Sequence, residues 1–276
     1  MKISLITACY NSAKTIKTAM ESVLSPKGVE IEYIIVDGGS NDGTVDIIKE
    51  FAACPVRPAS PSCPVIKWLS ERDRGMYDAI NKGIKMATGD VVGILNADDV
   101  LASDDTLAQI VERFEPLNTR NARKDGERVD CVYADIRFVK EGESVEALRG
   151  APTVRYCSAA RWRPWMFRFA AMVPHPSFYV RRECFERLGG YSLDYRICAD
   201  FELELRYLYL AKLKAAYLPE CVVVMRTGGM STSGWRSNVV INREDLRALR
   251  SHGIWSCLPL IYLKYLFKIW GFVFRG

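Results

Sequence analysis

The first hundred residues alternate between two hydrophobic periods, and this alternation constrains the fold more than any other feature of the chain. Short apolar runs predict buried strands, and apolar residues spaced three or four apart predict helices. Strand–helix–strand repetition implies right-handed crossovers, and therefore an α/β fold with a mainly parallel sheet and helices on both faces. The expected strands are Ile3–Cys9, Ile31–Val36, Val65–Leu69 and Val91–Leu95, and the expected helices are Ala13–Leu24, Thr44–Phe51 and Met76–Met86.

The second half of the chain has shorter and less regular periods. Residues 155–168 are rich in Arg and Trp without a clean period, so their conformation stays open. The strands expected here are Val129–Asp135, Ile136–Val139, His175–Val180 and Tyr217–Arg226, and the expected helices are Glu183–Leu188 and Asp200–Leu210.

Polar segments follow the expected parallel strands, at the edge of the sheet where the ligands of such folds bind. Three of the four segments contain carboxylates, and a cluster of carboxylates at one edge calls for a cation. Asp98 and Asp99 are adjacent, and Mg²⁺ or Mn²⁺ shared with phosphate oxygens would compensate their repulsion. The alternative is that Asp98 caps a turn and Asp99 is solvated. The four segments are Ala8–Asn11, Asp37–Asp42, Glu71–Gly75 and Asn96–Asp99.

Five segments, in their order and spacing, resemble the family 2 glycosyltransferases of the GT-A fold over roughly residues 2–228. The resemblance implies a nucleotide-sugar-binding fold and an inverting, metal-dependent transfer from a nucleoside-diphosphate sugar. The acceptor would be a hydroxyl of a saccharide or lipid-linked molecule in polysaccharide or glycolipid synthesis. The five segments are SLITACYN (4–11), IIVDGGSNDGT (34–44), ERDRGMYDAINKGIKMATGDVVGILNADD (71–99), HPSFYVRRECFERLGGY (175–191) and CADFELELR (198–206).

The resemblance also implies which residues bind the donor. The segment that begins at Thr7 should lie under the nucleotide, with Tyr10 near the base. Asp37 matches the acid that bonds the base, which favours a UDP-sugar, although guanine would fit equally and an Asx turn at Asp37 can coexist with either. The full set of implied donor-binding residues is Thr7, Tyr10, Asn11, Asp37, Asp73, Arg74 and Asp98.

The metal and the general base follow from the same resemblance. Asp99, with Asp98, would hold Mn²⁺ or Mg²⁺. Asp200 matches the general base, although Ala199 stands where such enzymes often carry a first acid. A plain helix N-cap is the alternative for Asp200. The fallback candidates for the base are Asp194 and Glu202.

Two further positions concern the acceptor and the metal. His175 is expected near the acceptor, and a buried, hydrogen-bonded His is the alternative. Met230 stands where a late His often completes the metal site of similar enzymes, so a third protein ligand is in doubt.

The C-terminal segment carries the charge excess of the chain. The net charge is +5, and residues 236–276 hold seven Lys or Arg against two acids. The concentration of basic residues in this segment argues for a local anionic partner and against a nucleic-acid-binding surface over the whole protein. We therefore expect a GT-A domain over residues 1–228 and a helical extension over 229–276.

The extension has the composition of amphipathic helices that lie on a membrane. Residues 254–274 are apolar and aromatic, and Lys264 and Lys268 share one helical face. Such a helix would lie in the interface, drawn to anionic lipid, while a membrane span or a core helix are the alternatives. Nine scattered cysteines without a Cys-x-x-Cys pair indicate a reduced chain. Together these features predict a cytoplasmic protein attached peripherally to the inner (plasma) membrane.

Other classes of protein fit the sequence less well. A sugar nucleotidyltransferase would need a Gly-rich, Arg-containing loop after the first strand, and a dinucleotide oxidoreductase would need G-x-G-x-x-G there. The segment ACYNSAK at residues 8–14 is neither. A non-catalytic nucleotide-sugar or membrane-binding module remains the rival from another class.

Overall fold

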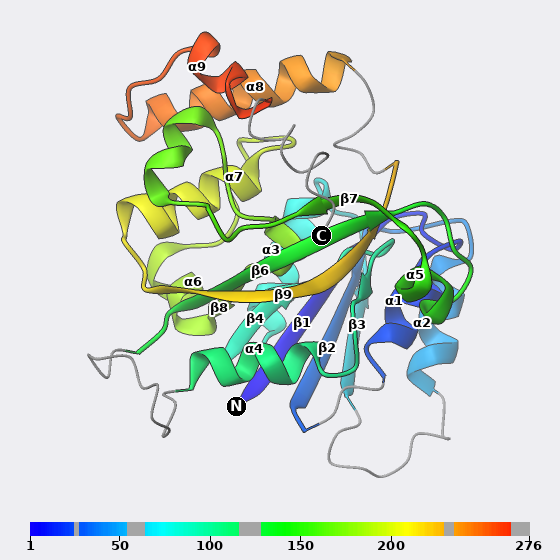
Figure 1. The fold of residues 1–276 in the computed structure, drawn as a ribbon. Helices are drawn as coiled ribbons and strands as arrows, with labels where there is room; N and C mark the ends of the chain where they lie inside the picture. The colour runs from blue at the N-terminus through cyan, green and yellow to red at the C-terminus, as the bar shows by residue number, and fades with distance from the viewer. Residues whose placement is uncertain (25–27, 54–63, 116–127, 229–234, 266–276) are drawn as a thin grey trace.

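The computed structural model describes residues 1–24, 28–53, 64–115, 128–228 and 235–265 (Figure 1). The position of Met230 and the end of the apolar segment 254–274 lie outside these residues.

Four parallel strands form one half of the sheet, in the order β3-β2-β1-β4. They are β1 (Lys2–Cys9), β2 (Glu30–Asp37), β3 (Val65–Ser70) and β4 (Val91–Ile94). Successive side chains enter different cores: Leu5 and Ile35 pack on one face of the sheet, and Ile6 and Ile34 pack on the other. Burial on both faces explains the continuous apolar runs of these strands.

The other half of the sheet mixes parallel and antiparallel pairs. Its strands are β5 (Val100–Leu101), β6 (Cys131–Val139), β7 (Thr153–Cys157), β8 (Tyr179–Arg181) and β9 (Ala215–Arg226). The order continues from β4 through β8, β6 and β9 to β5, with β7 beside β6. β6 runs parallel to β9, while β8 pairs antiparallel with both β4 and β6. The described residues thus form one nine-stranded sheet.

Two predicted strands differ in the structure. Val129–Asp135 and Ile136–Val139 are wrong as a strand pair, because β6 continues through both. Its register against β9 shifts at Asp135, whose buried carboxylate accepts hydrogen bonds from Tyr156 and Tyr217, so the polar residue marks an irregularity and not a turn. The predicted strand His175–Val180 begins instead as the 3-10 turn η2 (His175–Ser177).

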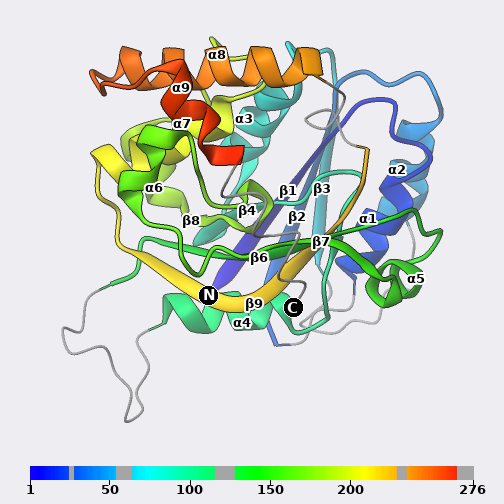
Figure 2. The same ribbon diagram turned by 45° about the horizontal axis from the view of Figure 1, so that its top comes forward.

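Helices cover both faces of the sheet, as the alternating periods predict (Figure 2). Apolar side chains of α1, α2 and α4 pack on one face, and those of α3, α6 and α7 pack on the other. These helices are, in the same order, Ile16–Ser22, Thr44–Ala53, Thr106–Phe114, Met76–Met86, Arg182–Leu188 and Ala199–Glu204. Two short elements, α5 (Val145–Gly150) and the 3-10 helix η1 (Pro164–Phe169), lie between β6 and β8 in the chain.

The predicted helix over Asp200–Leu210 is divided. α7 covers its first part, and the turns of Leu205–Leu210 have the wider π-helical hydrogen bonding. Wider turns of this kind are typical of functional regions.

The C-terminal segment packs against the body of the protein. Its helices are α8 (Trp235–Ser251), which contacts α7, and α9 (Leu258–Tyr262), which contacts η1. Ala248, Ile254 and Ile261 join the core that contains α7. The expectation of an exposed lysine face is wrong for Lys264, because its ammonium is buried in an ion pair with Asp245 at 2.6 Å.

The described helices do not match the dimensions of a bilayer. None of those within residues 1–24, 28–53, 64–115, 128–228 and 235–265 combines the length and the apolar character that a membrane crossing requires.

Candidate active site

The carboxyl ends of β1, β2 and β4 lie side by side, and predicted donor-binding residues follow each of them. Cys9 at the end of β1 is paired with Asp37 at the end of β2. On the other side of β1, the N–H of Leu95 donates to the carbonyl of Ile6 and extends the pairing past the end of β4. The parallel register therefore brings the three loops to one edge of the sheet, as predicted (Figure 1).

Asp37 builds the loop after β2. One carboxylate oxygen accepts the backbone N–H groups of Gly39 and Ser40, each at 3.0 Å, and the hydroxyl of Ser70 at 2.7 Å. Burial disfavours the charged form, but the hydrogen bonds from Ser40 and Ser70 outweigh it, and the pKa of Asp37 is lowered. The Asx turn expected from the sequence is confirmed, and Asp37 is ionised at neutral pH.

The loop after β1 is tied to the same turn. The side-chain oxygen of Asn11 accepts the N–H of Asn41 at 3.0 Å, and the N–H of Asn11 donates to Ser40. Tyr10 is 63% exposed, so its ring is open to a planar ligand. Thr7 is fully buried, and its hydroxyl donates to the carbonyl of Leu95 at 2.7 Å. Thr7 therefore supports the loop from beneath and has no surface exposed to a ligand.

The segment after β3 brings Asp73 and Arg74 to different places. Asp73 lies against Gly38, where a Cβ atom would come within 2.5 Å of its carboxylate, so the side chain of Asp73 borders the loop after β2. Arg74 is exposed and pairs with Asp78 at 3.5 Å. Arg74 also lines a hollow of about 520 Å³ between α3 and α6, and none of the acids at the ends of β2 and β4 lines it. Asp73 thus joins the predicted donor side, whereas the side chain of Arg74 lies away from it.

Asp98 and Asp99 follow β4 and differ in their surroundings. Asp98 is partly exposed, while Asp99 is 1% exposed and accepts from Asn96 at 2.7 Å through one oxygen. The other oxygen of Asp99 is buried and has no hydrogen-bond partner among the described residues. Burial, and next the charge of Asp98, raise the pKa of Asp99 well above its usual range.

This environment fits a cation held against phosphate oxygens. An unpaired buried carboxylate oxygen is costly unless a cation or a donor satisfies it. In the part of the chain that the structure describes, no group of three or more His, Cys, Asp or Glu side chains is placed to share a metal ion. Two carboxylates with further oxygens from the substrate are the arrangement that Mg²⁺ accepts.

Arg226 is a residue of this site that sequence reasoning missed. It ends β9, donates to the backbone carbonyl of Asp98, and also donates to Thr18 at 2.8 Å and to the carbonyl of Gly142 at 3.2 Å. Its charge lowers the pKa of Asp99 and partly compensates the acid pair. The pairing of β5 with β9 places it there. In the sequence, the one indication that Arg226 belongs to the site was its position at the end of a predicted strand.

Asp200 lies beside the first turn of α3, which begins at the same edge of the sheet. The Tyr77 hydroxyl is 3.2 Å from one carboxylate oxygen of Asp200 and also donates to the carbonyl of Ile197. The N-cap of α7 is Cys198, so the N-cap alternative for Asp200 is wrong and the residue lies within the first turn. Burial of the carboxyl group, opposed by hydrogen bonds from Phe201 and Tyr77, raises the pKa of Asp200 to about 6. A carboxylate with this pKa suits a general base near neutral pH.

His175 is linked to Asp200 through two tyrosines, Tyr191 and Tyr77. Its Nε2 atom is 2.7 Å from the hydroxyl of Tyr191, and the ring of Tyr191 stacks on Tyr77 with centroids 5.6 Å apart. Burial lowers the pKa of His175 to about 4, so the ring is neutral at physiological pH. The structure thus places His175 in the buried, hydrogen-bonded environment that the sequence left as its alternative.

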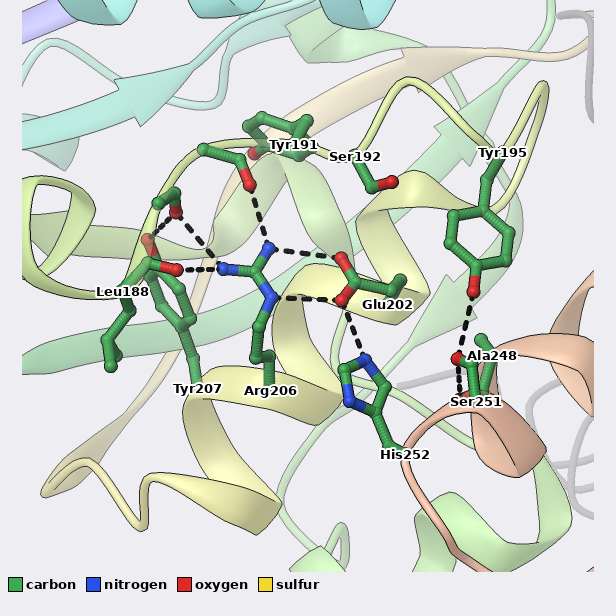
Figure 3. A network of polar contacts seen from close by, with 12 residues as sticks. Leu188, Tyr191, Ser192, Tyr195, Glu202, Arg206, Tyr207, Ala248, Ser251 and His252 are labelled. Carbon is green, nitrogen blue, oxygen red and sulfur yellow. Dashed lines mark hydrogen bonds and ion pairs between the residues drawn. The ribbon is translucent and has the colours of Figure 1, made fainter.

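The two fallback candidates for the base have different surroundings, and Figure 3 shows those of Glu202. Arg206 donates to both carboxylate oxygens of Glu202, at 2.9 and 3.0 Å, and His252 lies 2.8 Å from one of them. Arg206 also donates to the carbonyls of residues 188–190 and fixes the turn that follows α6. Glu202 is therefore engaged in an ion-pair network, while Asp194 is exposed.

Comparisons with known proteins agree on one family. Residues 4–146 match the family model described as "Glycosyl transferase family 2". A "PGL/p-HBAD biosynthesis glycosyltransferase" of Mycobacterium tuberculosis (strain ATCC 25177 / H37Ra) is 27% identical over 249 residues, which cover 89% of this chain and 83% of the relative. A second relative from M. tuberculosis (strain ATCC 25618 / H37Rv), described as an uncharacterized glycosyltransferase, is 29% identical over 205 residues, 74% of this chain and 68% of that protein.

Solved structures share the fold at low sequence identity. S. aureus TarS 1-349 in complex with UDP-GlcNAc has a TM-score of 0.60 at 17% identity, over 90% of this chain and 66% of that one. The mannosyltransferase PcManGT from Pyrobaculum calidifontis, in complex with GDP-Man and Mn²⁺, has a TM-score of 0.60 at 21% identity, over 98% of this chain and 72% of that one. The chain spans 40% of another TarS chain and about two thirds of the TarS 1-349 chains that it matches.

Proposed function

This chain belongs to glycosyl transferase family 2 and has the GT-A fold, and from that premise we propose that it catalyses an inverting, metal-dependent sugar transfer. The donor is a nucleoside-diphosphate sugar, with a UDP-sugar favoured. The acceptor is a hydroxyl of a saccharide or a lipid-linked molecule in polysaccharide or glycolipid synthesis.

The observation that carries this proposal is a pair of unequal acidic centres. Asp98 and Asp99 follow β4, and Asp99 has a buried carboxylate oxygen without a hydrogen-bond partner among the described residues. Asp200 lies beside the start of α3 with a pKa raised to about 6. The first centre suits the binding of a cation and phosphates, and the second suits the acceptance of a proton. An inverting transfer needs both functions.

The donor side supports a nucleotide. The turn built by Asp37 and Asn11 lies beside the exposed ring of Tyr10, which offers a stacking surface for a base. Asp73 borders the same turn. The structural neighbours were solved with UDP, UDP-GlcNAc and GDP-Man, which supports a nucleoside-diphosphate sugar as the donor.

Mn²⁺ or Mg²⁺ held by Asp99 and Asp98 would supply positive charge for the departing diphosphate. The Mn²⁺ named with the mannosyltransferase neighbour supports this part of the proposal. Arg226, on the carbonyl of Asp98, adds fixed positive charge nearby. Arg74 would have to leave Asp78 to reach a phosphate.

Asp200 would take the proton of the acceptor hydroxyl while the oxygen of that hydroxyl attacks the anomeric carbon. The bond from that carbon to the diphosphate oxygen breaks as the new bond forms on the opposite face, and the diphosphate leaves with the electron pair. Tyr77 orients the carboxylate of Asp200 by its hydrogen bond. His175, through Tyr191, supports the ring of Tyr77 from behind the acceptor side.

The extension over residues 229–276 would hold the enzyme on the cytoplasmic face of the inner membrane, next to a lipid-linked acceptor. Arg243, Arg247 and Arg250 are exposed on α8. Trp255 is 73% exposed and Tyr262 is 49% exposed. Exposed arginines beside exposed aromatic rings are typical of surfaces that bind anionic lipid. The relative named for PGL/p-HBAD biosynthesis supports a role in glycolipid assembly.

A panel of nucleotide-sugars tests the proposal, with released nucleoside diphosphate as the readout, in Mn²⁺ and in excess chelator. We expect turnover with one donor class and its collapse in chelator. Asp99→Asn should abolish that turnover, whereas Asp105→Asn, at an exposed acid a few residues along, should retain it. Full activity of Asp99→Asn or in chelator would refute the metal-dependent mechanism.

A further inference from the structure

The helix that carries Asp200 begins without a cap from its own sequence. The N-cap residue of α7 is Cys198, and it makes no side-chain cap hydrogen bond. A helix leaves its first backbone N–H groups without partners inside the helix. The groups at and before this end need an acceptor from another part of the protein.

Glu244 of α8 supplies that acceptor. One carboxylate oxygen accepts the N–H of Arg196 at 3.1 Å, and the other accepts the N–H groups of Ile197 at 2.9 Å and Cys198 at 3.0 Å. Three consecutive backbone groups, ending two residues before Asp200, are thus held by one side chain. Hydrogen bonds to a carboxylate are about twice as strong as those between neutral groups.

Other contacts join α8 to the same segment. The carbonyl of Ile241 accepts from the Cys198 thiol at 3.6 Å, and Tyr195 and Ser251 share a hydrogen bond at 3.1 Å. His252, just after α8, contacts Glu202 of α7 at 2.8 Å (Figure 3). The contacts with Glu244 therefore belong to a continuous interface along α8.

We propose that Glu244 is a positioning residue of the transfer reaction, which fixes the backbone of residues 196–198 and through it the carboxylate of Asp200. This inference rests on the proposed role of Asp200 as the base. It makes α8 part of the catalytic apparatus and gives the C-terminal segment a task beyond membrane attachment. Glu244 itself does not touch the substrate.

Glu244 acts on Asp200 by charge as well as by position. Its negative charge favours the protonated form of Asp200 and adds to the effect of burial on that pKa. Other titratable and charged groups also face Asp200. They are Tyr77 from α3, Tyr191 from the preceding turn, Cys198 and Glu204 from the segment of α7, and Asp245 from α8 with its partner Lys264.

Two variants of the full-length chain separate these effects. Glu244→Ala removes the acceptor and the charge, while Glu244→Gln keeps one carbonyl oxygen and removes the charge. Asn238→Ala, at an exposed position of the same helix, is the matched control. For each variant we would measure kcat, KM for the donor, the pH profile of kcat, and the affinity for the free nucleoside diphosphate.

We expect Glu244→Ala to lower kcat roughly 100-fold, the loss typical of a displaced catalytic group. Nucleoside-diphosphate affinity and donor KM should stay near wild type, because the donor side is built by other residues. Glu244→Gln should recover most of kcat, and its acid limb should move to lower pH because Asp200 loses a neighbouring negative charge. A merely structural role would leave that limb in place.

Several results would overturn the inference without touching the proposed function. Wild-type kcat in Glu244→Ala, alongside an inactive Asp200→Asn, would show that Asp200 needs no support from α8. Equal losses of kcat and nucleoside-diphosphate affinity in Glu244→Ala, not recovered in Glu244→Gln, would show that Glu244 supports the whole fold and does not specifically position Asp200. An unshifted acid limb in an active Glu244→Gln would remove the electrostatic link. Failure of the proposed function would appear differently, as no transfer by wild type from any donor.

Discussion

The donor side and the base side of this site are held together in different ways. On the donor side, the loops after β1, β2 and β4, Asp37 accepts backbone groups only two and three residues along the chain. On the base side, the segment 190–204, the hydroxyl that meets Asp200 belongs to Tyr77, 123 residues away in sequence. Glu244 reaches Ile197 across 47 residues. The turn at Asp37 is thus largely local, with added contacts from Ser70 and, at Asp98, from Arg226. The carboxylate of Asp200, in contrast, is positioned mainly by residues from distant parts of the chain.

This difference separates binding from chemistry. Changes on the base side should reduce kcat and leave donor binding intact, while changes on the donor side should weaken binding of the nucleotide. Long-range contacts also expose the base side to perturbation from elements that never meet the substrate. The predictions that follow test this separation.

Asp200→Asn should cause the largest loss. Replacing a general base typically lowers the rate by 10²–10⁴, so we expect kcat to fall about a thousandfold. Binding of the nucleoside diphosphate, measured by calorimetry, should be unchanged because Asp200 is not on the donor side. Asp194→Asn changes an exposed acid in the preceding loop and should keep wild-type kcat. The reverse result would move the role of base to Asp194.

The same contrast explains what the sequence could and could not predict. Buried parallel strands and the Asx turn at Asp37 were predictable because apolar runs and turn residues act locally. Arg226 and Glu244 were not, because their partners lie on elements that only the sheet order and the packing of α8 bring near.

Two wrong expectations have the same origin. The strand break at Asp135 failed because a polar residue can be satisfied inside a sheet by distant tyrosines. The exposed face expected for Lys264 failed because the residue pairs with Asp245, nineteen positions earlier. In both cases a tertiary partner changed what a local pattern indicated.

Tyr77→Phe should sharpen the comparison through pH. In wild type, kcat should fall as the pH drops below about 6, because the base must be deprotonated. The Tyr77 hydroxyl stabilises the charged form of Asp200, so its loss raises the pKa and moves the acid limb to higher pH. The shift is opposite in sign to that of Glu244→Gln. We expect kcat at neutral pH to fall about tenfold, the order of one hydrogen bond to a charged group.

Tyr156→Phe serves as the control for that variant. It removes a half-buried phenol hydroxyl that donates to the carboxylate of Asp135, on another part of the sheet. Its pH profile should match wild type. An acid limb that moves equally in both variants would mean that the profile reports global stability and not Asp200.

Ser70→Ala tests the donor side and should have a smaller effect. Its hydroxyl donates to Asp37 at 2.7 Å, and loss of one such bond costs about 1 kcal/mol. Nucleoside-diphosphate affinity should fall about fivefold, with kcat at saturating donor unchanged. Ser192→Ala, which removes a hydroxyl that donates to Asp194, is the matched change on the base side and should leave affinity intact. A fall in kcat without a change in affinity for Ser70→Ala would erase the distinction between the two sides.

Trp255→Ala should have the smallest effect on chemistry, and it tests whether the C-terminal segment performs two separable tasks. Trp255 is 73% exposed, while its neighbours Ile254 and Ser256 are buried and anchor the loop to the body. Losing one exposed tryptophan should weaken binding to anionic vesicles roughly tenfold, given about 1.5–3 kcal/mol for burying a large apolar side chain. Turnover of a soluble acceptor should be unchanged. The control is Trp68→Ala, at an exposed tryptophan on β3, which should bind vesicles normally.

If the wild-type protein does not bind anionic vesicles at all, the proposed membrane attachment is refuted and α8 keeps its positioning role alone. Conversely, a fall in kcat in Trp255→Ala would mean that membrane anchoring and the positioning of Asp200 depend on the same packing of α8. The base side would then respond to whatever the C-terminal segment binds.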